Sequence, residues 1–301
     1  MNNLTVCKTI FAPAKVNIHL TIKNKRIDGF HNLESLFLAV DFGDFLHFLP
    51  VQEEKTIEIT MKGEKKGKEY HSVPLKSNII FKALSLFREK TGFFQGLKIT
   101  VDKRIPFGSG LGGGSSNAAA TLLALNQIAG SPLGQDSLLE LGASLGSDVP
   151  FFLHKTTAAW VTGRGENIKP LDTSLHGLRR INLVLVNPGF PSDTTTAYRL
   201  LDEHRTNSGE PLDRHIPDIK NWSNDFLAVF PKREKSIYNE IISSLQECGA
   251  EFASLSGAGS TCFGVFGEKE QAQKAAQKAA ESLRNKWDFV QVCRSYQFVH
   301  L

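Results

Sequence analysis

Long apolar runs, clustered cysteines and blocks of like charge are all missing from this sequence of 301 residues. No stretch of 18 apolar residues occurs, so we expect no membrane-spanning helix. The four cysteines, Cys7, Cys248, Cys262 and Cys293, are far apart and show no CxxC or Cys/His spacing, which argues against a zinc site. We expect them to be reduced core residues of a cytoplasmic protein.

The first residues of the chain and its net charge indicate where the protein is located and which ligands it binds. The segment up to Lys15 has no basic stretch followed by a long apolar stretch, so we expect no signal peptide. The formal net charge of +4 suits an anionic small molecule but is too small to indicate a nucleic-acid partner. With 41% hydrophobic and 22% charged residues, the composition is that of a globular protein, and the sequence does not indicate an oligomeric state.

Hydrophobic periodicity predicts a mixture of strands and helices without regular βαβ alternation, which favours the α+β class. The pattern weakens around residues 171–180, so we place a boundary there, with domains at residues 1–172 and 173–301. The region 207–217 is polar and is expected to be an exposed loop. Strands are expected at 17–23, 33–40, 45–49, 56–61, 97–101, 156–162, 181–186 (a buried strand), 252–256, 261–266 and 289–298, and helices from Ser77 to Gly92, at 115–128, from Ser137 to Gly146, at 235–248 and at 268–283. Ser77 is expected to cap the first helix, whose inward face is Ile80, Ala83, Leu84 and Phe87. The last helix is expected to pack through the stripe Ala272, Ala275, Ala276, Ala279 and Leu283.

A glycine-rich stretch from Pro106 to Ser116 is the most informative segment. Five of the seven positions from 108 to 114 are glycine, which permits positive φ angles and leaves no Cβ in the way of a ligand. The stretch leads into an Ala-rich helix whose first N–H groups are unpaired, and together these features predict an anion site suited to polyphosphate. It is neither a Walker A loop nor a complete Rossmann fingerprint. A flexible linker is the alternative.

Two charged residues stand in apolar surroundings, and each has two interpretations. Asp148, within the segment 146–152, is either a cap at a helix terminus or a carboxylate held for proton transfer. Lys15, within an apolar strand pattern, is either a surface lysine with a buried stem or a buried cation that needs a partner.

Two turns complete the set of candidate segments. In the turn Asp28-Gly29-Phe30-His31, an aromatic ring beside a histidine suits a nucleobase held by stacking and hydrogen bonds, although core packing would explain it as well. The second turn, Ser256 to Ser260, lies between two expected strands and is explained equally well by a tight hairpin.

These segments, in this order, resemble the GHMP kinase superfamily, and more closely its 4-diphosphocytidyl-2-C-methyl-D-erythritol kinase family. The resemblance covers nearly the whole chain and rests on the joint occurrence of the motifs at 12–17, 26–31, 106–116, 146–152, 187–189, 224–225 and 256–259. It implies a two-domain α+β fold, with an N-terminal domain like the second domain of ribosomal protein S5 and a ferredoxin-like C-terminal domain. It also implies phosphorylation, by ATP, of the 2-hydroxyl of the cytidyl substrate in the non-mevalonate route to isoprenoids.

The resemblance further implies a role for each matching residue. Asp148 would be the general base and Lys15 its charge partner. The substrate would be held by Asn17, Phe30, His31, Thr194 and Tyr198. ATP would be bound by Asn78, Pro106, Phe107, Gly108, Ser109, Gly110, Leu111, Gly112, Gly113, Gly114, Ser115 and Ser116. Magnesium is expected with ATP, and Ser115 and Ser116 are the candidate ligands, but the sequence assigns none.

Two positions depart from the family pattern, and two other functions compete with it. Phe30 stands where a tyrosine is usual, so stacking survives without a hydroxyl contact, and Asn187 stands where histidine is common. A homoserine, mevalonate or galactose-type kinase is one alternative, but a small polyol substrate needs no aromatic ring at position 30. An RNA-binding protein is the other, but it would show a basic stripe with interleaved aromatic residues, and the charges here are evenly spread.

Overall fold

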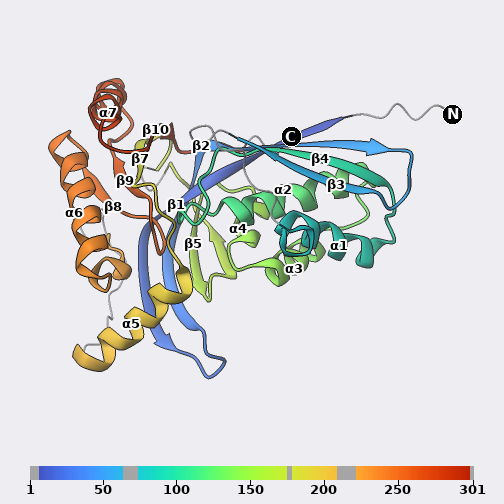
Figure 1. The fold of residues 1–301 in the computed structure, drawn as a ribbon, viewed down its shortest axis with the longest axis horizontal. Coiled ribbons are helices and arrows are strands. Elements are labelled where there is room, and N and C mark those ends of the chain that lie inside the picture. Colours follow the sequence, from blue (N-terminus) through green and yellow to red (C-terminus); the bar gives the residue numbers. More distant parts are fainter. Residues whose placement is uncertain (1–6, 64–73, 175–177, 209–221, 299–301) are drawn as a thin grey trace. The chain divides into compact units, whose positions relative to one another are not determined.

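The computed structural model of the protein describes residues 7–63, 74–174, 178–208 and 222–298. The chain forms two compact units, and each is assembled from separate stretches of sequence. Unit 1 comprises residues 1–14, 43–106 and 112–155, and unit 2 comprises residues 15–42, 107–111 and 156–301. The long strands β1 (Lys8–Lys25) and β2 (His31–Val51) contribute to both units (Figure 1). A discontinuous division of this kind does not test the boundary between residues 172 and 173, which stays a prediction.

Unit 1 consists of paired strands with helices on one side (Figure 1). Strand β4 (Gly96–Asp102) pairs in parallel with β3 (Ile57–Lys62) and antiparallel with residues 45–51 of β2. Alternate residues of β4, Leu97, Ile99 and Val101, are buried, as the period of a half-exposed strand predicts. The helices that pack against one another are α1 (Ile79–Thr91), α2 (Gly113–Ile128), α3 (Gln135–Leu145) and α4 (Val149–Leu153), and a 3-10 turn, η1 (Leu75–Ser77), precedes α1.

Helix α1 confirms the predicted apolar face but begins one residue later than expected. Its buried residues are Ile80, Ala83, Leu84 and Phe87, which is the predicted set. The prediction that Ser77 caps this helix is wrong, because the Ser77 hydroxyl donates to the carbonyl of Pro74. Asn78 is the cap instead, and its Oδ1 accepts a hydrogen bond from the N–H of Ile80 at 2.9 Å.

Strand β2 is a single strand of 21 residues where the sequence predicts two. The polar residues between the two apolar runs suggest a break, but the structure keeps them within the strand. An ideal Cβ on Gly43 would lie 2.2 Å from the carbonyl oxygen of Ala12, so glycine permits β1 to approach closely at this point. The carboxylate of Asp44 is fully buried and accepts the backbone N–H groups of Arg104 and Ile105 at 2.7 and 2.9 Å.

Unit 2 contains two sets of paired strands. Residues 33–38 of β2 pair antiparallel with β5 (Ala158–Gly163), which in turn pairs with β6 (Asn167–Pro170). A separate antiparallel sheet has the strand order β10-β7-β9-β8. Its strands are β7 (Asn182–Asn187), β8 (Phe252–Leu255), β9 (Cys262–Val265) and β10 (Phe289–Arg294). All six residues of β7 are buried, which agrees with the buried strand predicted at 181–186.

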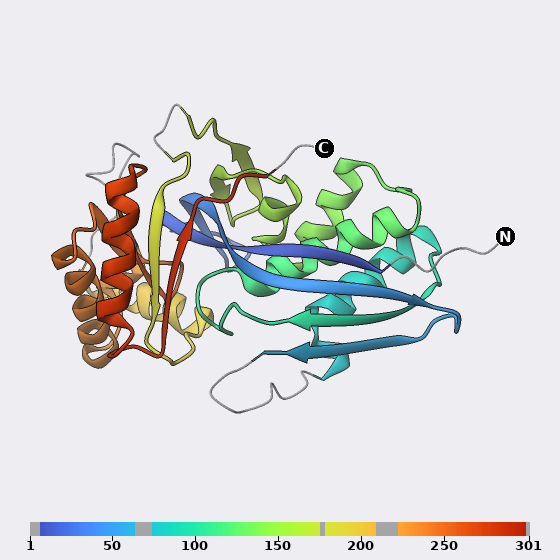
Figure 2. The same cartoon turned by 90° about the horizontal axis from the view of Figure 1, so that it is seen from above.

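Helices α6 (Lys232–Glu247) and α7 (Glu270–Leu283) cover one face of this four-stranded sheet (Figure 2). Of the predicted packing face of α7, Ala276, Ala279 and Leu283 are buried, whereas Ala272 and Ala275 are only partly buried. No helix in the described part of the chain is long and apolar enough to cross a membrane. All four cysteines are unpaired, and Cys262 and Cys293 are buried as predicted, whereas Cys7 is exposed.

Helix α5 (Thr194–Ser208) is the main element that the sequence analysis missed, together with the short η3 (Asp225–Ala228). The start of α5 carries a clear local signal, because the carboxylate of Asp193 accepts hydrogen bonds from the backbone N–H groups of Thr195 and Thr196 and from the Thr196 hydroxyl. The expected loop at residues 207–217 is wrong at its first two residues, which end α5, and residues 209–217 lie outside the described part.

A buried ion pair lies at the entrance to the glycine-rich segment in unit 1. The Lys103 ammonium donates to Asp44 at 2.7 Å and also to the carbonyl of Ile105, and its side chain is 3% exposed. Burial lowers the pKa of Lys103, and the charge of Asp44 opposes this shift. An ideal Cβ on Gly113 would lie 3.2 Å from the Lys103 nitrogen, so the pair also adjoins the first turn of α2.

We predict that Asp44→Asn destabilises the protein strongly, because it removes the negative charge that pairs with the buried Lys103 ammonium. The free energy of unfolding should fall by about 3–5 kcal/mol, as measured by urea titration. Lys98→Met is a suitable control, since it breaks a pair between Lys98 and Glu58 in which both side chains are about half exposed. The control should cost less than about 1 kcal/mol. Equal losses in the two variants would show that burial does not set the cost.

Candidate functional site

Within unit 2, the glycine-rich segment packs directly against the turn at residues 256–260. Gly110 has a φ of +76°, and an ideal Cβ placed on it would lie 2.1 Å from the carbonyl oxygen of Ser256 and 2.8 Å from that of Gly259. No side chain fits in this space, so glycine is required here on both conformational and steric grounds. The backbone N–H of Thr261 donates to the carbonyl of Ser109 at 3.1 Å. The linker interpretation is therefore wrong, because this part of the segment is held by specific contacts.

The hydroxyl of Ser256 joins this contact to strand β1. It donates to the carbonyl of Gly110 at 2.9 Å and accepts the backbone N–H of Asn17 at 3.1 Å. The backbone N–H of Lys15 donates to the carbonyl of Leu111 at 3.0 Å. One end of the glycine-rich segment is thus fixed beside the stretch of β1 that carries two of the predicted site residues.

Lys15 is buried, so the interpretation as a surface lysine is wrong. It is 4% exposed, and its ammonium donates to Oδ1 of Asn17 at 2.5 Å and lies 4.6 Å from the centre of the Phe37 ring. Asn17 is 3% exposed and donates from Nδ2 to the hydroxyl of Ser35 at 2.9 Å. Lys15 is therefore a cation inside the protein that contacts an amide oxygen and an aromatic face.

Within unit 1, the second part of the glycine-rich segment begins helix α2. Gly112 is the N-cap residue with a φ of +69°, and no side chain caps the helix. The first N–H groups of a helix have no partners within the helix and carry a partial positive charge. The hydroxyl of Ser116 is buried and has no hydrogen-bond partner among the described residues. This arrangement suits a bound anion that accepts hydrogen bonds from the start of the helix.

Asp148 lies immediately before α4 and is half-buried. Its side chain makes no capping hydrogen bond, so the interpretation as a helix cap is wrong. The N–H of Val149 instead donates to the carbonyl of Gly146 at 3.1 Å. Ser115 adjoins this turn, because its hydroxyl would lie 3.9 Å from an ideal Cβ on Gly146. Unit 1 therefore brings the start of α2 close to the turn that carries Asp148.

Two other predicted ATP-binding residues, Asn78 and Phe107, differ in their exposure to solvent. Asn78 is 5% exposed, and its side chain is used as the cap of α1. Phe107 presents a ring that is 46% exposed, and the carbonyl of the next residue, Gly108, accepts the N–H of Ser192 at 2.8 Å. Asn78 and Asp148 belong to unit 1, whereas Phe107 and Lys15 belong to unit 2.

A second group of predicted residues meets in unit 2 around His31. The ring of His31 stacks on Tyr198 of α5, with ring centres 5.1 Å apart and an angle of 20° between the rings. The Nε2 atom of His31 lies 2.7 Å from Oδ1 of Asp202, which also accepts a hydrogen bond from Lys25 at its other oxygen. Thr194 is the exposed first residue of α5.

Phe30 is exposed and held at its backbone and at one ring face. Its ring is 54% exposed, and its N–H donates to Asp28 at 3.2 Å. The guanidinium of Arg164 lies 5.0 Å from the centre of the ring. Core packing is therefore wrong for Phe30, although His31, at 6% exposed, is buried.

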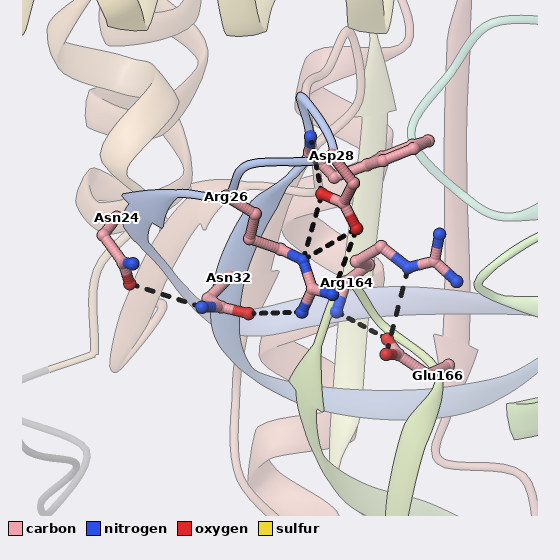
Figure 3. A network of polar contacts seen from close by, with 7 residues as sticks. Asn24, Arg26, Asp28, Asn32, Arg164 and Glu166 are labelled. Atoms are coloured by element: carbon pink, nitrogen blue, oxygen red, sulfur yellow. Dashed lines mark hydrogen bonds and ion pairs between the residues drawn. The ribbon is translucent and has the colours of Figure 1, made fainter.

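A network of polar contacts surrounds the turn that carries Phe30, as Figure 3 shows. Arg26 forms an ion pair with Asp28 and also donates to Asn32 at 3.1 Å, while Arg164 is held by Glu166, which accepts its backbone N–H at 2.5 Å. The hydrogen bond from Arg26 lowers the pKa of Asp28, against a smaller opposing effect of burial. An exposed aromatic ring held in this way is suited to stacking on a planar ligand.

The sequence analysis missed three residues of this site: Ser256 as a junction, Arg164 beside Phe30, and Asp202 beside His31. Ser256 was found only as part of a turn, because its partners are more than 140 positions away in the chain. Arg164 follows a glycine at the end of β5, which is a weak signal for a turn. Asp202 could have been placed on a helix from the sequence if the capping signal at Asp193 had been used to predict α5.

Comparisons with known proteins identify the family of the chain. Family models of the GHMP kinases N terminal domain and the GHMP kinases C terminal match residues 78–156 and 216–285. A 4-diphosphocytidyl-2-C-methyl-D-erythritol kinase from Thermodesulfovibrio yellowstonii is 36% identical over 285 residues, which is 90% of this chain and 93% of that protein. One from Dehalococcoides mccartyi is 37% identical over 275 residues, covering 88% and 92%.

Solved structures give the same result. A crystal structure of 4-(cytidine 5'-diphospho)-2C-methyl-D-erythritol kinase matches with a TM-score of 0.73 and 30% identity, covering 95% of this chain and 98% of that one. Homoserine kinase from Cytophaga hutchinsonii, at 19% identity and a TM-score of 0.65 over 99% and 96% of the chains, shares the fold alone.

The fold and the glycine-rich segment thus define a kinase of the GHMP class, with the predicted two-domain α+β architecture. Because these relatives are 36% and 37% identical over about nine-tenths of the chain, the chain belongs to the 4-diphosphocytidyl-2-C-methyl-D-erythritol kinase family. It is therefore an enzyme that transfers a phosphoryl group.

Proposed function

We propose that this kinase transfers the γ-phosphoryl group of ATP to the 2-hydroxyl of 4-diphosphocytidyl-2-C-methyl-D-erythritol, in the non-mevalonate route to isoprenoids. The observation that carries the proposal is the similarity, over about nine-tenths of the chain, to relatives with that name. The exposed ring of Phe30 next to the buried His31 favours a nucleobase-bearing acceptor over homoserine, mevalonate or galactose. The cytoplasmic location stays a prediction.

The glycine-rich segment is proposed to bind the phosphates of ATP. Phosphoryl transfer requires alignment of the reacting groups and neutralisation of the charge on the transferred phosphoryl group. Backbone N–H groups at the uncapped start of α2 supply fixed dipoles for both purposes, and the unpaired hydroxyl of Ser116 supplies a further donor. We propose that residues 106–116, together with Asn78 at the start of α1, form the ATP site.

Magnesium is expected to enter with the nucleotide rather than to occupy a site built from protein carboxylates. The described part of the chain has no group of three His, Cys, Asp or Glu side chains that is placed to hold a metal ion. The hydroxyls of Ser115 and Ser116 at the start of α2 fit a hydrated magnesium ion that is bound mainly by phosphate oxygens. Such an ion neutralises phosphate charge during transfer.

Asp148 is proposed to accept the proton of the attacking 2-hydroxyl, with Lys15 as its charge partner. The support is that the side chain of Asp148 makes no capping hydrogen bond, lies close to the start of α2 through Gly146 and Ser115, and is partly exposed. Lys15 is a buried cation that contacts the Asn17 amide and the Phe37 ring. A nearby cation favours the ionised form of a carboxylate and stabilises a developing oxyanion. Asn17, His31, Phe30, Thr194 and Tyr198 are proposed to hold the substrate.

We predict that Asp148→Asn folds normally but lowers the turnover number by roughly 10²–10⁴-fold, the usual contribution of a general base. The measurement is the rate of ADP formation at saturating ATP and cytidyl substrate, with circular dichroism to verify folding. Asp136→Asn, which changes an exposed carboxylate in the first turn of α3, is the matched control and should keep its activity. Near-normal turnover of Asp148→Asn would remove this residue from the mechanism.

A second prediction concerns the stacking role of Phe30. Phe30→Ala should raise the KM for the cytidyl substrate about tenfold, because stacking of a base on an aromatic ring contributes roughly 1–3 kcal/mol, while the KM for ATP should stay unchanged. Phe94→Ala is the control, since that ring is 50% exposed and also carries a lysine ammonium over its face, at 5.5 Å. A similar rise in both KM values, or none in either, would contradict the assigned role.

A further inference from the structure

The carboxylate of Asp202 connects two basic groups in unit 2 in a defined way. Its Oδ1 lies 2.7 Å from Nε2 of His31, and its Oδ2 accepts a hydrogen bond of 2.6 Å from the ammonium of Lys25. The side chain of His31 is 4% exposed, whereas that of Asp202 is 31% exposed. Burial acts to raise the pKa of Asp202, but the hydrogen bonds from Lys25 and His31 outweigh it, so its pKa is lower than that of an ordinary aspartate. The carboxylate is therefore ionised at neutral pH.

This contact determines which nitrogen of His31 carries the proton. An ionised carboxylate can only accept hydrogen bonds, so the atom facing it, Nε2, must be the protonated one. In a neutral imidazole the other nitrogen, Nδ1, is then an acceptor. Lys25 places a positive charge beside the carboxylate, so the ion pair of Asp202 does not depend on a charged His31.

The ring of His31 is also fixed in orientation, and its second nitrogen is not used within the described part of the protein. Tyr198 stacks on one face, and Tyr198 is in turn held by the edge of Phe226, with ring centres 5.0 Å apart. No described residue forms a hydrogen bond with Nδ1 of His31. A buried ring with one edge fixed and one acceptor unused is arranged to receive a hydrogen-bond donor.

We propose that Asp202 is a specificity-determining residue, which holds His31 in the tautomer whose Nδ1 accepts a hydrogen bond from the exocyclic amine of an aminopyrimidine. This inference rests on the proposed function, in which His31 contacts the base. A cytosine presents an amine at the relevant edge, whereas a uracil presents a carbonyl oxygen, which would meet another acceptor. Asp202 thereby selects against uridyl analogues without touching the base.

Lys25 makes the test of this proposal sharper. In Asp202→Asn the side chain has one acceptor and one donor group. The Lys25 ammonium can only donate, so it holds the amide oxygen, and the NH₂ group is turned towards Nε2 of His31. The imidazole must then accept at Nε2 and carry its proton on Nδ1. The variant is therefore expected to reverse the hydrogen-bonding character of the nitrogen that faces the base.

The experiment compares kcat/KM for the cytidyl substrate with that for its uridyl analogue, in the wild type and in Asp202→Asn. The ratio of the two values should fall at least tenfold in the variant, mainly through the KM values, because the reacting hydroxyl is remote from the base. In Lys25→Met/Asp202→Asn the amide is free to rotate, so the ratio should recover in part. Glu203→Gln, which changes an exposed carboxylate on the same helix, should leave the ratio unchanged.

Each other outcome has a distinct meaning. A wild type that does not phosphorylate the cytidyl substrate would overturn the proposed function. A wild type that does, with an Asp202→Asn variant that loses activity equally on both substrates or on neither, would overturn the specificity role of Asp202 alone. If the variant does not fold, ¹⁵N chemical shifts of the wild-type imidazole decide the question, and a protonated Nδ1 with a bare Nε2 would contradict the proposal.

Discussion

The absence of space for a side chain at Gly110 is the constraint on which the arrangement in unit 2 depends. Two backbone carbonyls, of Ser256 and Gly259, occupy the position that a Cβ would take, and the Ser256 hydroxyl links Gly110 to the backbone of Asn17. These contacts fix the path of the glycine-rich segment at Gly110 through groups of the protein itself. Preorganisation of this kind is what transfer of a charged phosphoryl group requires, since the dipoles need not reorient during the reaction.

Buried polar groups in this protein fall into two kinds. Asp44 and Lys103 satisfy each other and nearby backbone groups, and their pair supports the strand that leads into the glycine-rich segment. Lys15 and His31 are also buried, and Asp202 beside His31 is partly exposed; in our proposals Lys15 supplies charge and His31 recognises the base. We expect the first kind to contribute to stability and the second, in these proposals, to recognition and chemistry. Burial alone does not separate the two kinds, whereas the identity of the partners does.

Much of the fold could be predicted from local sequence patterns. The elements that differ from the prediction depend on contacts between residues far apart in the chain. The apolar stripe of α1 and the buried strand β7 were predictable, because their periodicity is set within a few residues. The continuity of β2 was not, since it depends on the partners that Asp44 finds about 60 positions away. Of the candidate site, the glycine-rich segment was identified from its composition and Lys15 through the family resemblance. The contact of Asp202 with His31, 171 positions away, leaves no local pattern in the sequence.

The central claim is that backbone N–H groups of the glycine-rich segment, and not a lysine of a Walker type, bind the phosphates of ATP. The most direct measurement is a crystal structure of the protein with magnesium and a non-hydrolysable ATP analogue. Our account predicts β- and γ-phosphate oxygens within about 3.2 Å of backbone nitrogens between Gly108 and Ser116, as is usual for N–H···O hydrogen bonds. Phosphates bound elsewhere, or held only by side chains while those backbone nitrogens make no contact with them, would contradict it.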